Sequence, residues 1–317
     1  MATTTTAPGT GSWVSVAERG SILGMRFVVW CYRVLGRRFC QWLILPVVLY
    51  FFVTDRKGRR ASLRYLRRLY KRPGGPEALG GFPTWRHSLR HYHAYGLSIL
   101  DRVGFWLGRD GDYSIAFHGA ELFTRLREEG RGAIILGTHL GSFDALRVLA
   151  RRSQVVVNVV MFIQHARMIN SIFQSLGQEA SIRMIQLDAN SINAAFAMKA
   201  CIERGEFVAL LADRVGIGDE KRTGQIEFLG DRTAFPHGPF FLASLLKCPA
   251  IFMVALRAGD GRYEAFAEWA AERIVVSGRD DLDALAADYA RRLERYCLRA
   301  PYQWFNFYDY WSDEDRR

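Results

Sequence analysis

One segment brings together residue types that can move a proton: AIILGTHLGSFDALRVLA, at positions 133 to 150. An apolar, β-branched run ends just before His139, and Asp144 falls in the first turn of the helix that Ser142 is suited to cap. On one continuous helix the two side chains would point about 140° apart, but a turn at Gly141 removes that obstacle. The carboxylate can then hold one imidazole nitrogen while the other takes a proton from a substrate.

A simpler interpretation of the same two residues stays open at this point. His139 can be an ordinary polar residue at a strand end, and Asp144 can be a charge placed favourably at a helix N-terminus. The spacing of a His and an Asp five positions apart occurs often by chance. The elements around the pair must therefore decide between the two interpretations.

Several other chemistries lack their sequence signatures. The chain has no GxxxxGK[ST] loop, no GxGxxG after its first strand, no GxSxG elbow and no HExxH helix. The cysteines are far apart without a CxxC pair, and the three histidines between positions 87 and 93 have no acidic residue or cysteine at ligand spacing, which favours a polar helix face. We therefore predict reduced thiols, no metal site and no bound cofactor.

From residue 113 onward, short β-branched runs alternate with amphipathic stretches. The runs predicted as strands are 113 to 117, 133 to 137, 155 to 162, 182 to 187, 207 to 213 and 250 to 257. The predicted helices between them are 119 to 130, 142 to 152, 165 to 176, 190 to 204 and 237 to 247. This alternation predicts an α/β fold, a mixed and mostly parallel sheet flanked by helices, with ligands at the carboxyl ends of its strands.

The charge is concentrated near the N-terminus. Residues 1 to 110 hold 18 Lys/Arg against 5 Asp/Glu, while the remainder of this chain of net charge +11 is close to neutral. A basic, aromatic-rich segment before a neutral body indicates an anionic membrane surface and argues against nucleic acid as the partner.

The apolar part of this region is short for a membrane span. Sixteen uncharged residues, 39 to 54, separate two charged positions, with Pro46 among them. As a helix they reach about 24 Å, less than the roughly 30 Å hydrocarbon core. We favour an interfacial or re-entrant hairpin; a single span and a buried pair of core helices remain alternatives.

Residues 56 to 72 carry nine basic side chains and no acidic one, with Leu63, Leu66 and Tyr70 at helical spacing between them. This pattern predicts a basic amphipathic helix in contact with membrane headgroups, since nine unbalanced charges repel each other unless something anionic compensates. The chain then divides into a tail at 1–12, membrane-associating helices at 13–83 and an α/β domain at 84–317.

The segments GTHLGSFD, LLADRVGIGDEKRTGQIEFLGDRTAFPHGPFFLASLLKCP and APYQWFNFYDYW together resemble the lipid A biosynthesis (lauroyl/myristoyl-type) acyltransferase family of the lysophospholipid acyltransferase superfamily. The resemblance implies a glycerolphosphate acyltransferase-like fold and transfer of a fatty acyl chain from a thioester, usually on acyl carrier protein, to a membrane-bound acceptor. It implies that His139 is the general base and Asp144 its orienting residue. The residues that it assigns to the acceptor and acyl site include Asp213, Arg214, Phe228, Gly230, Pro236 and Gly238, and physical reasoning adds Arg232 to the predicted substrate-binding residues.

Physical reasoning adds to this second block. Asp213 and Arg214 follow a strand, so they emerge at the sheet edge of His139 if the strands are parallel. Arginines here are suited to grip a phosphate, although solvated loop charge is an equal alternative for Arg232. The aromatic residues between 304 and 311 are predicted to pack in the core, with an acyl-channel wall or an interfacial aromatic belt as the alternatives.

The sequence departs from the family at three places. It has Asp144 where the family carries Glu, Arg214 and Val215 where the family carries Gln and Asp, and a less basic C-terminal signature. These differences leave the identity of the acceptor open.

We therefore expect an acyltransferase at the cytoplasmic face of a bacterial inner membrane, using acyl carrier protein and a lipid acceptor, without a metal. A catalytically silent lipid-binding protein of the same fold is the alternative. A hydrolase is disfavoured because nothing marks a Ser or Cys nucleophile.

Overall fold

The computed structural model describes residues 22–162, 182–187, 192–216 and 221–311. Its helices are α1 (Ile22–Thr54), α2 (Arg56–Tyr70), α3 (Gly75–Leu79), α4 (Trp85–Trp106), α5 (Ala120–Glu128), α6 (Phe143–Arg152), α8 (Ile192–Glu203), α9 (Gly238–Leu246) and α10 (Arg279–Arg299). Its strands are β1 (Ser114–His118), β2 (Ala133–Gly137), β3 (Val157–Phe162), β4 (Ile182–Leu187), β5 (Phe207–Leu211), β6 (Thr223–Phe228), β7 (Asp231–Pro236), β8 (Ala250–Gly259) and β9 (Arg262–Ala271).

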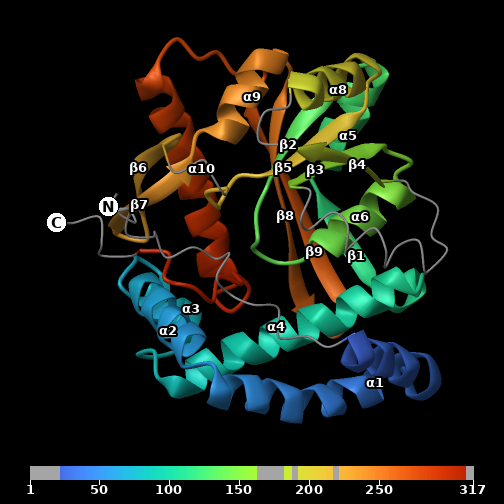
Figure 1. The fold of residues 1–317 in the computed structure, drawn as a ribbon, viewed down its shortest axis with the longest axis vertical. Coiled ribbons are helices and arrows are strands. Elements are labelled where there is room, and N and C mark those ends of the chain that lie inside the picture. The colour runs from blue at the N-terminus through green and yellow to red at the C-terminus, as the bar shows by residue number, and fades with distance from the viewer. Residues whose placement is uncertain (1–21, 163–181, 188–191, 217–220, 312–317) are drawn as a thin grey trace, which may run out of the picture.

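Within these residues, seven strands form one sheet in the order β1-β9-β8-β2-β5-β3-β4 (Figure 1). The strands from β8 to β4 are parallel to one another, while β9 pairs with β8 in the antiparallel sense and β1 runs parallel to β9. The expected mixed, mostly parallel sheet is confirmed. Two elements that the alternation did not predict, β9 and α10, follow β8 along the chain, and β6 and β7 form a separate hairpin.

Alternate residues of the central strands supply two different cores. Ile134 and Leu136 of β2 pack with α8, α9 and α10 on one face, whereas Ile135 packs with α5 and α6 on the other. Both sides of β2 are buried because helices cover both faces of the sheet, as a parallel sheet requires. The predicted helix at 165 to 176 lies outside the described residues.

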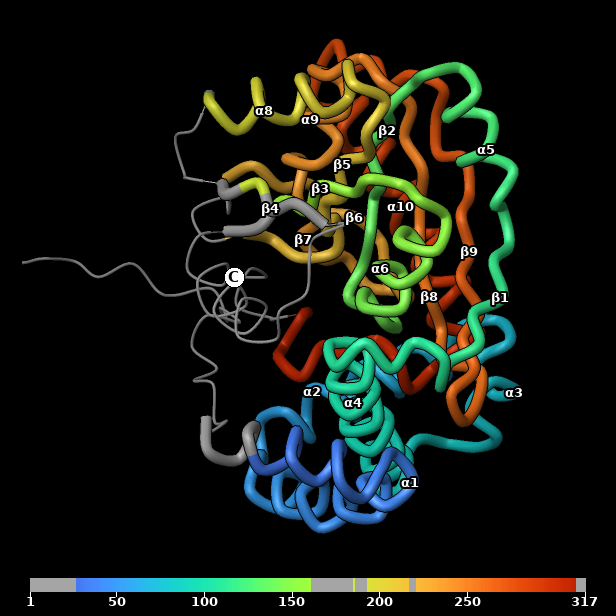
Figure 2. Tube along the Cα trace, turned by 90° about the vertical axis from the view of Figure 1, so that its right-hand side faces the viewer, coloured from blue at the N-terminus to red at the C-terminus, as the bar shows by residue number. Residues whose placement is uncertain are grey.

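The N-terminal helices form a layer below the sheet. α1 runs along α4, and α2 lies between α4 and the β6–β7 hairpin (Figures 1 and 2). α1 is interrupted at Gly36, whose φ of 77° is open to glycine without strain, so two helical segments meet there at a kink. The predicted domain boundary at residue 83 stays a prediction, and α4, which it assigns to the α/β domain, packs against both α1 and α2.

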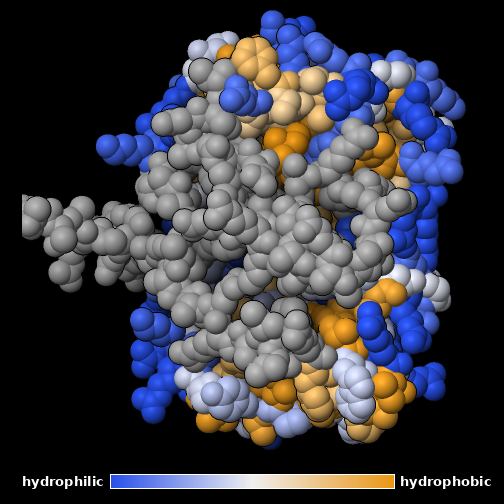
Figure 3. Space-filling view, turned by 45° about the vertical axis from the view of Figure 1, so that its right-hand side comes forward, coloured by the Kyte–Doolittle hydropathy of each residue, from blue (hydrophilic) through white to orange (hydrophobic). Residues whose placement is uncertain are grey.

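The outer side of α1 is apolar and exposed. The stretch Phe27–Thr54 is long and apolar enough to cross a membrane by length and composition, and only 11% of its apolar window is buried. Figure 3 shows apolar side chains gathered along the lower edge of the molecule, where α1 lies; the most exposed are Trp42 at 74%, Tyr50 at 63% and Val53 at 61%. A helix buried in a protein core is therefore the wrong description of α1.

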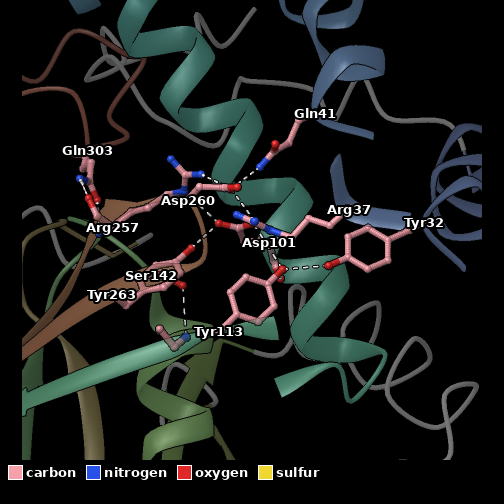
Figure 4. Close-up of polar contacts among 11 residues, drawn as sticks. Tyr32, Arg37, Gln41, Asp101, Tyr113, Ser142, Arg257, Asp260, Tyr263 and Gln303 are labelled. Atoms are coloured by element: carbon pink, nitrogen blue, oxygen red, sulfur yellow. Dashed lines mark hydrogen bonds and ion pairs between the residues drawn. The ribbon is translucent and has the colours of Figure 1, made fainter. Parts of the chain in front are cut away.

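A cluster around the buried Asp101 fastens α1 to the sheet (Figure 4). The Asp101 carboxylate accepts hydrogen bonds from Arg37 of α1, from Arg257 of β8 and from Tyr263 of β9, at 2.7–3.0 Å. Tyr32 of α1 is joined to Tyr113 by a 3.0 Å contact between their hydroxyls. These bonds occupy the inner side of α1 and leave its apolar outer side free.

The nine basic residues of 56–72 are partly neutralised by the protein itself. Arg68 pairs with Asp231 at 2.7 Å, Arg72 pairs with Glu294 at 2.6 Å, and Arg64 pairs with Asp309. The expectation that all nine charges are unbalanced is wrong, because one side of α2 faces acidic residues of the α/β domain. The basic residues that stay exposed without an ion pair in the described part of the chain are Arg56, Lys57, Arg60, Arg67 and Lys71.

Candidate active site

The loop between β2 and α6 carries His139 and is held on three sides. Gly141 has φ 79°, and a Cβ there would lie 2.0 Å from the carbonyl oxygen of Ala255, so only glycine fits. The Gly141 N–H donates to the carbonyl of Gln303, and the Ser142 N–H donates to the carbonyl of Ala255. The Ser142 side chain caps α6 by accepting from the N–H of Ala145 at 3.2 Å, as expected. The loop is thereby fixed between β8 and the C-terminal segment.

The carboxylate that holds His139 is Asp213. β2 and β5 are parallel and pair in register at their ends, which brings Asp213 beside His139 as the strand pattern predicted. The two side chains lie 2.7 Å apart, from Nδ1 to Oδ1, and the backbone N–H of His139 donates to Oδ2 at 2.9 Å. The expected hydrogen bond between His139 and Asp144 is absent among the described contacts, because Asp144 turns toward α4 and binds Arg102 and Trp106 instead.

Asp213 is fully buried and its oxygens are saturated with donors. Besides His139, Oδ2 accepts from the Thr138 hydroxyl at 3.0 Å and from the Trp304 indole N–H at 3.1 Å. Burial by itself raises the pKa of this carboxyl, but His139, its hydrogen bonds and the charge of Arg214 hold that pKa far below its usual range. Asp213 is thus an ionised hydrogen-bond acceptor. His139 carries a proton on Nδ1, and through it donates a hydrogen bond to Asp213.

The His139 ring keeps Nε2 for a substrate. Burial and then the positive charge of Arg214 lower the pKa of His139 below its usual value, against the opposing effect of Asp213. The ring is therefore neutral near pH 7, and its side chain is 29% exposed. A neutral imidazole whose Nδ1–H is fixed by a carboxylate presents a free lone pair on Nε2, which is the form that a general base needs.

Arg214, the next residue after Asp213, is tied to the C-terminal segment. Its Nε donates to the Asn306 side chain at 2.6 Å, and Nη2 donates to the carbonyl of Phe305 at 3.0 Å. Tyr310 donates to the backbone carbonyl of Asp213 at 2.7 Å. The segment around 304–310 therefore encloses the site, a role that goes beyond the core packing or acyl channel considered from the sequence.

The remaining predicted binding residues lie around the β6–β7 hairpin. Phe228 is fully buried, with its ring 5.2 Å from that of Trp304, whereas Gly230 supplies the tight turn with φ 88°. Arg232 is exposed and donates to the carbonyl of Gln225 at 3.1 Å, with no described hydrogen bond or ion pair to His139 or Asp213. Pro236 is buried at the end of β7, and Gly238 opens α9. Phe228 contacts Trp304, which in turn donates to Asp213.

His91 is buried, and not on the polar helix face that its spacing predicted. Its Nε2 lies 3.0 Å from the carbonyl oxygen of Trp304, and its Nδ1 lies 3.0 Å from the Ser62 hydroxyl. Burial lowers the pKa of His91 to about 3, so this ring stays neutral and braces the backbone of Trp304. The described residues contain no group of three or more His, Cys, Asp or Glu side chains that could hold a metal.

An apolar cavity of about 40 Å³ lies between α6 and the sheet. Phe143, Leu146 and Ala150 of α6 line one side, and Ile135 and Val157 line the other. The cavity places hydrocarbon-compatible surface within one helical turn of the loop that carries His139.

Comparisons with known proteins identify the family of the chain. The profile of the family described as bacterial lipid A biosynthesis acyltransferase matches residues 91–312, which include the whole His139 loop and Asp213. Among solved structures, the chain is similar to the 1-acyl-sn-glycerophosphate (LPA) acyltransferase PlsC from Thermotoga maritima, with a TM-score of 0.38 and 11% identity over 82% of this chain and 98% of that chain. No curated protein matches the chain significantly.

Proposed function

Because the chain belongs to the bacterial lipid A biosynthesis acyltransferase family, we propose that it moves a fatty acyl chain from the thioester of acyl carrier protein to a hydroxyl or amine of a lipid or glycolipid acceptor. Family membership makes the protein an acyltransferase of lipid biosynthesis. The donor, the acceptor group and the mechanism are the proposal. The observation that carries the mechanism is the 2.7 Å contact between His139 Nδ1 and the buried carboxylate of Asp213.

In the proposed reaction, Nε2 of His139 takes the proton of the acceptor hydroxyl or amine as its oxygen or nitrogen attacks the thioester carbonyl. A new ester or amide bond forms and the carbon–sulfur bond breaks. The departing thiolate then takes the proton from Nε2, which restores the neutral ring. Asp213 stays ionised throughout and stabilises the transient imidazolium through Nδ1–H.

The test of this assignment is turnover of an acyl thioester by purified variants. We expect His139→Ala to lose about 10²- to 10⁴-fold in rate, the usual contribution of a general base. His118→Ala is the matched control, because His118 is exposed on β1 and stacks on Phe266. A His139→Ala protein that keeps more than about a tenth of the wild-type rate would reject the base assignment and favour a silent lipid-binding protein.

We also propose that α1 lies in the membrane interface at the cytoplasmic face of the inner membrane. Two observations support this placement: the exposed apolar side of α1, and the exposed basic residues of α2 beside it. Aromatic side chains such as Trp42 and Tyr50 suit the headgroup boundary. Since the inner side of α1 is bonded to Asp101 and its neighbours, an orientation along the membrane surface keeps the protein's own contacts intact.

Vesicle sedimentation checks this placement. Replacing Trp30, Trp42 and Tyr50 with Ser should release the protein from vesicles that contain anionic lipid, whereas Phe196→Ser with Phe241→Ser, equally exposed on α8 and α9, should not. Replacing Arg56, Lys57 and Arg60 with Gln should weaken binding at low salt and have little effect at high salt. Unchanged vesicle binding of the α1 variant would reject the proposal that the apolar side of α1 contacts the membrane.

Acyl carrier proteins are strongly acidic, so the same exposed basic residues are suited to dock the donor. Charge reversal at Arg67 and Lys71 should raise the KM for an acyl carrier protein donor more than for acyl-CoA of equal chain length. Arg64 and Arg68 are unsuitable for this test, because they already bind Asp309 and Asp231. The assay uses neutral detergent, which removes lipid charge from the comparison, and equal effects on both donors would reject acyl carrier protein docking at α2.

A further inference from the structure

Asp144 is bound to the helix layer below it. Its Oδ1 accepts from the indole N–H of Trp106 and its Oδ2 accepts from Nε of Arg102, both at 2.9 Å. Both partners belong to α4, which passes beneath α6 in two perpendicular views (Figures 1 and 2). The Asp144 side chain is only 9% exposed, so its charge is balanced by this arginine and not by water. Asp144, at the start of α6, therefore positions Arg102.

Arg102 binds Asp144 through one of its three side-chain nitrogens, and its two terminal nitrogens are available to a ligand. Only Nε takes part in the bond to Asp144, and its terminal nitrogens make no hydrogen bond or ion pair within the described ranges. The side chain is 40% exposed, although its carboxylate partner is buried. An arginine fixed in this way presents the flat end of its guanidinium fork, the arrangement that binds phosphate or carboxylate with two parallel hydrogen bonds.

A second arginine, Arg147 of α6, lies near the same carboxylate. Burial and, to a smaller extent, the charge of Arg102 lower the pKa of Arg147, against the opposing effect of Asp144. Arg102 also acts on His139, whose pKa its charge lowers after the larger effects of burial and Arg214. Through Asp144, Arg102 is bound at the start of α6, the helix that directly follows the His139 loop.

We propose that Arg102, positioned by Asp144, binds an anionic group, phosphate or carboxylate, that the lipid acceptor carries close to its accepting hydroxyl or amine. This inference rests on the proposed acyl transfer and adds the chemical class of the acceptor. The phosphate of the donor is a poor fit, because the long pantetheine arm separates it from the thioester, whereas Arg102 binds Asp144, the fifth residue after His139. An anion at Arg102 fixes the acceptor with its nucleophile beside Nε2.

The first experiment needs no turnover. Diethyl pyrocarbonate modifies neutral imidazole, and mass spectrometry of the peptide that contains His139 measures the rate. In the wild type, inorganic phosphate should slow this modification relative to chloride at the same ionic strength. Arg102→Gln should need about tenfold or more phosphate for the same protection, and Arg90→Gln, exposed on the same helix, should behave as wild type. Equal protection in Arg102→Gln overturns the proposal.

The second experiment compares two acceptors that differ in one group: lysophosphatidic acid, which has a phosphate, and monoacylglycerol, which lacks it. Arg102→Gln should raise KM for the anionic acceptor by about tenfold or more and leave the neutral acceptor unchanged. An equal fall in kcat with both acceptors overturns the proposal, because it would mean that Arg102 stabilises the oxyanion of the reaction.

Two further results keep the inference separate from folding and from the proposed function. If Arg102→Gln fails to fold, Arg102→Lys decides, since a lysine keeps the charge without the fork and should also weaken phosphate protection. If the wild type transfers acyl groups to neither acceptor but phosphate protection depends on Arg102, the anion site stands and both glycerolipids are excluded as the acceptor.

Discussion

Two carboxylates lie beside the same loop and have opposite surroundings. Asp213, at the carboxyl end of β5, is fully buried and accepts from His139, Thr138 and Trp304. Asp144, at the start of α6, is bound to an arginine whose other end is open. Position next to the histidine in sequence did not decide which carboxylate holds it. The partners that the sheet and α4 bring close decided it.

The largest expected effect comes from Asp213→Asn. The amide cannot accept from Nδ1–H and bind its other donors in the same way, so His139 loses its fixed tautomer and the support for its positive form. We expect kcat to fall by about 10²- to 10⁴-fold, with KM little changed. Steady-state kinetics measure this, and thermal unfolding shows whether the protein stays folded. A fall in kcat no larger than that of Asp144→Asn would contradict the assignment of Asp213 as the carboxylate that holds His139.

Asp144→Asn should have an intermediate effect of a different kind. The amide oxygen can still accept from Trp106, but the charge that fixes Arg102 is lost. We expect KM for an anionic acceptor to rise by about tenfold while kcat changes less. If kcat fell as far as in Asp213→Asn, Asp144 would be assigned to His139 after all.

The smallest expected effect is a displaced pH profile. His139 must be neutral to act, so kcat/KM falls as the pH drops through its pKa, which lies below the usual 6.5. Arg214→Gln removes a charge that lowers this pKa, so the acid limb should move to higher pH. Arg214→Lys keeps a charge there and should shift the limb less. An acid limb at the same pH in both variants would remove Arg214 as a cause.

Much of the sheet could be predicted from sequence, because buried parallel strands consist of short runs of apolar residues. β2 and β4 have the predicted bounds. The end of the strand predicted at 207 to 213 correctly placed Asp213 at the same edge of the sheet as His139. The antiparallel β9, RYEAFAEWAA, has charged residues on both sides of its buried centre and no long apolar run, and it was missed. Apolar runs of this type predict single strands and do not predict which strands or side chains meet in the fold.

The pairings in the site could not be predicted in the same way. Arg102 lies 42 positions before Asp144, on a helix whose orientation depends on α1 and the sheet, and no local pattern records that contact. Trp304 is 91 positions from Asp213. The ion pairs of α2 with Asp231 and Glu294 likewise follow from how α2 packs, so the basic run in the sequence overstated its free charge.

The clamp formed by Gln303, Trp304 and Tyr310 on the His139 loop and Asp213 also sets an order of events during synthesis. The helices proposed to meet the membrane leave the ribosome first, and β2 and β5 follow, but the base has no completed setting until residues near 304 have emerged. A chain still being translated can therefore be attached to its membrane while its active site is unassembled, and activity begins only after residues 303 to 310 have been made.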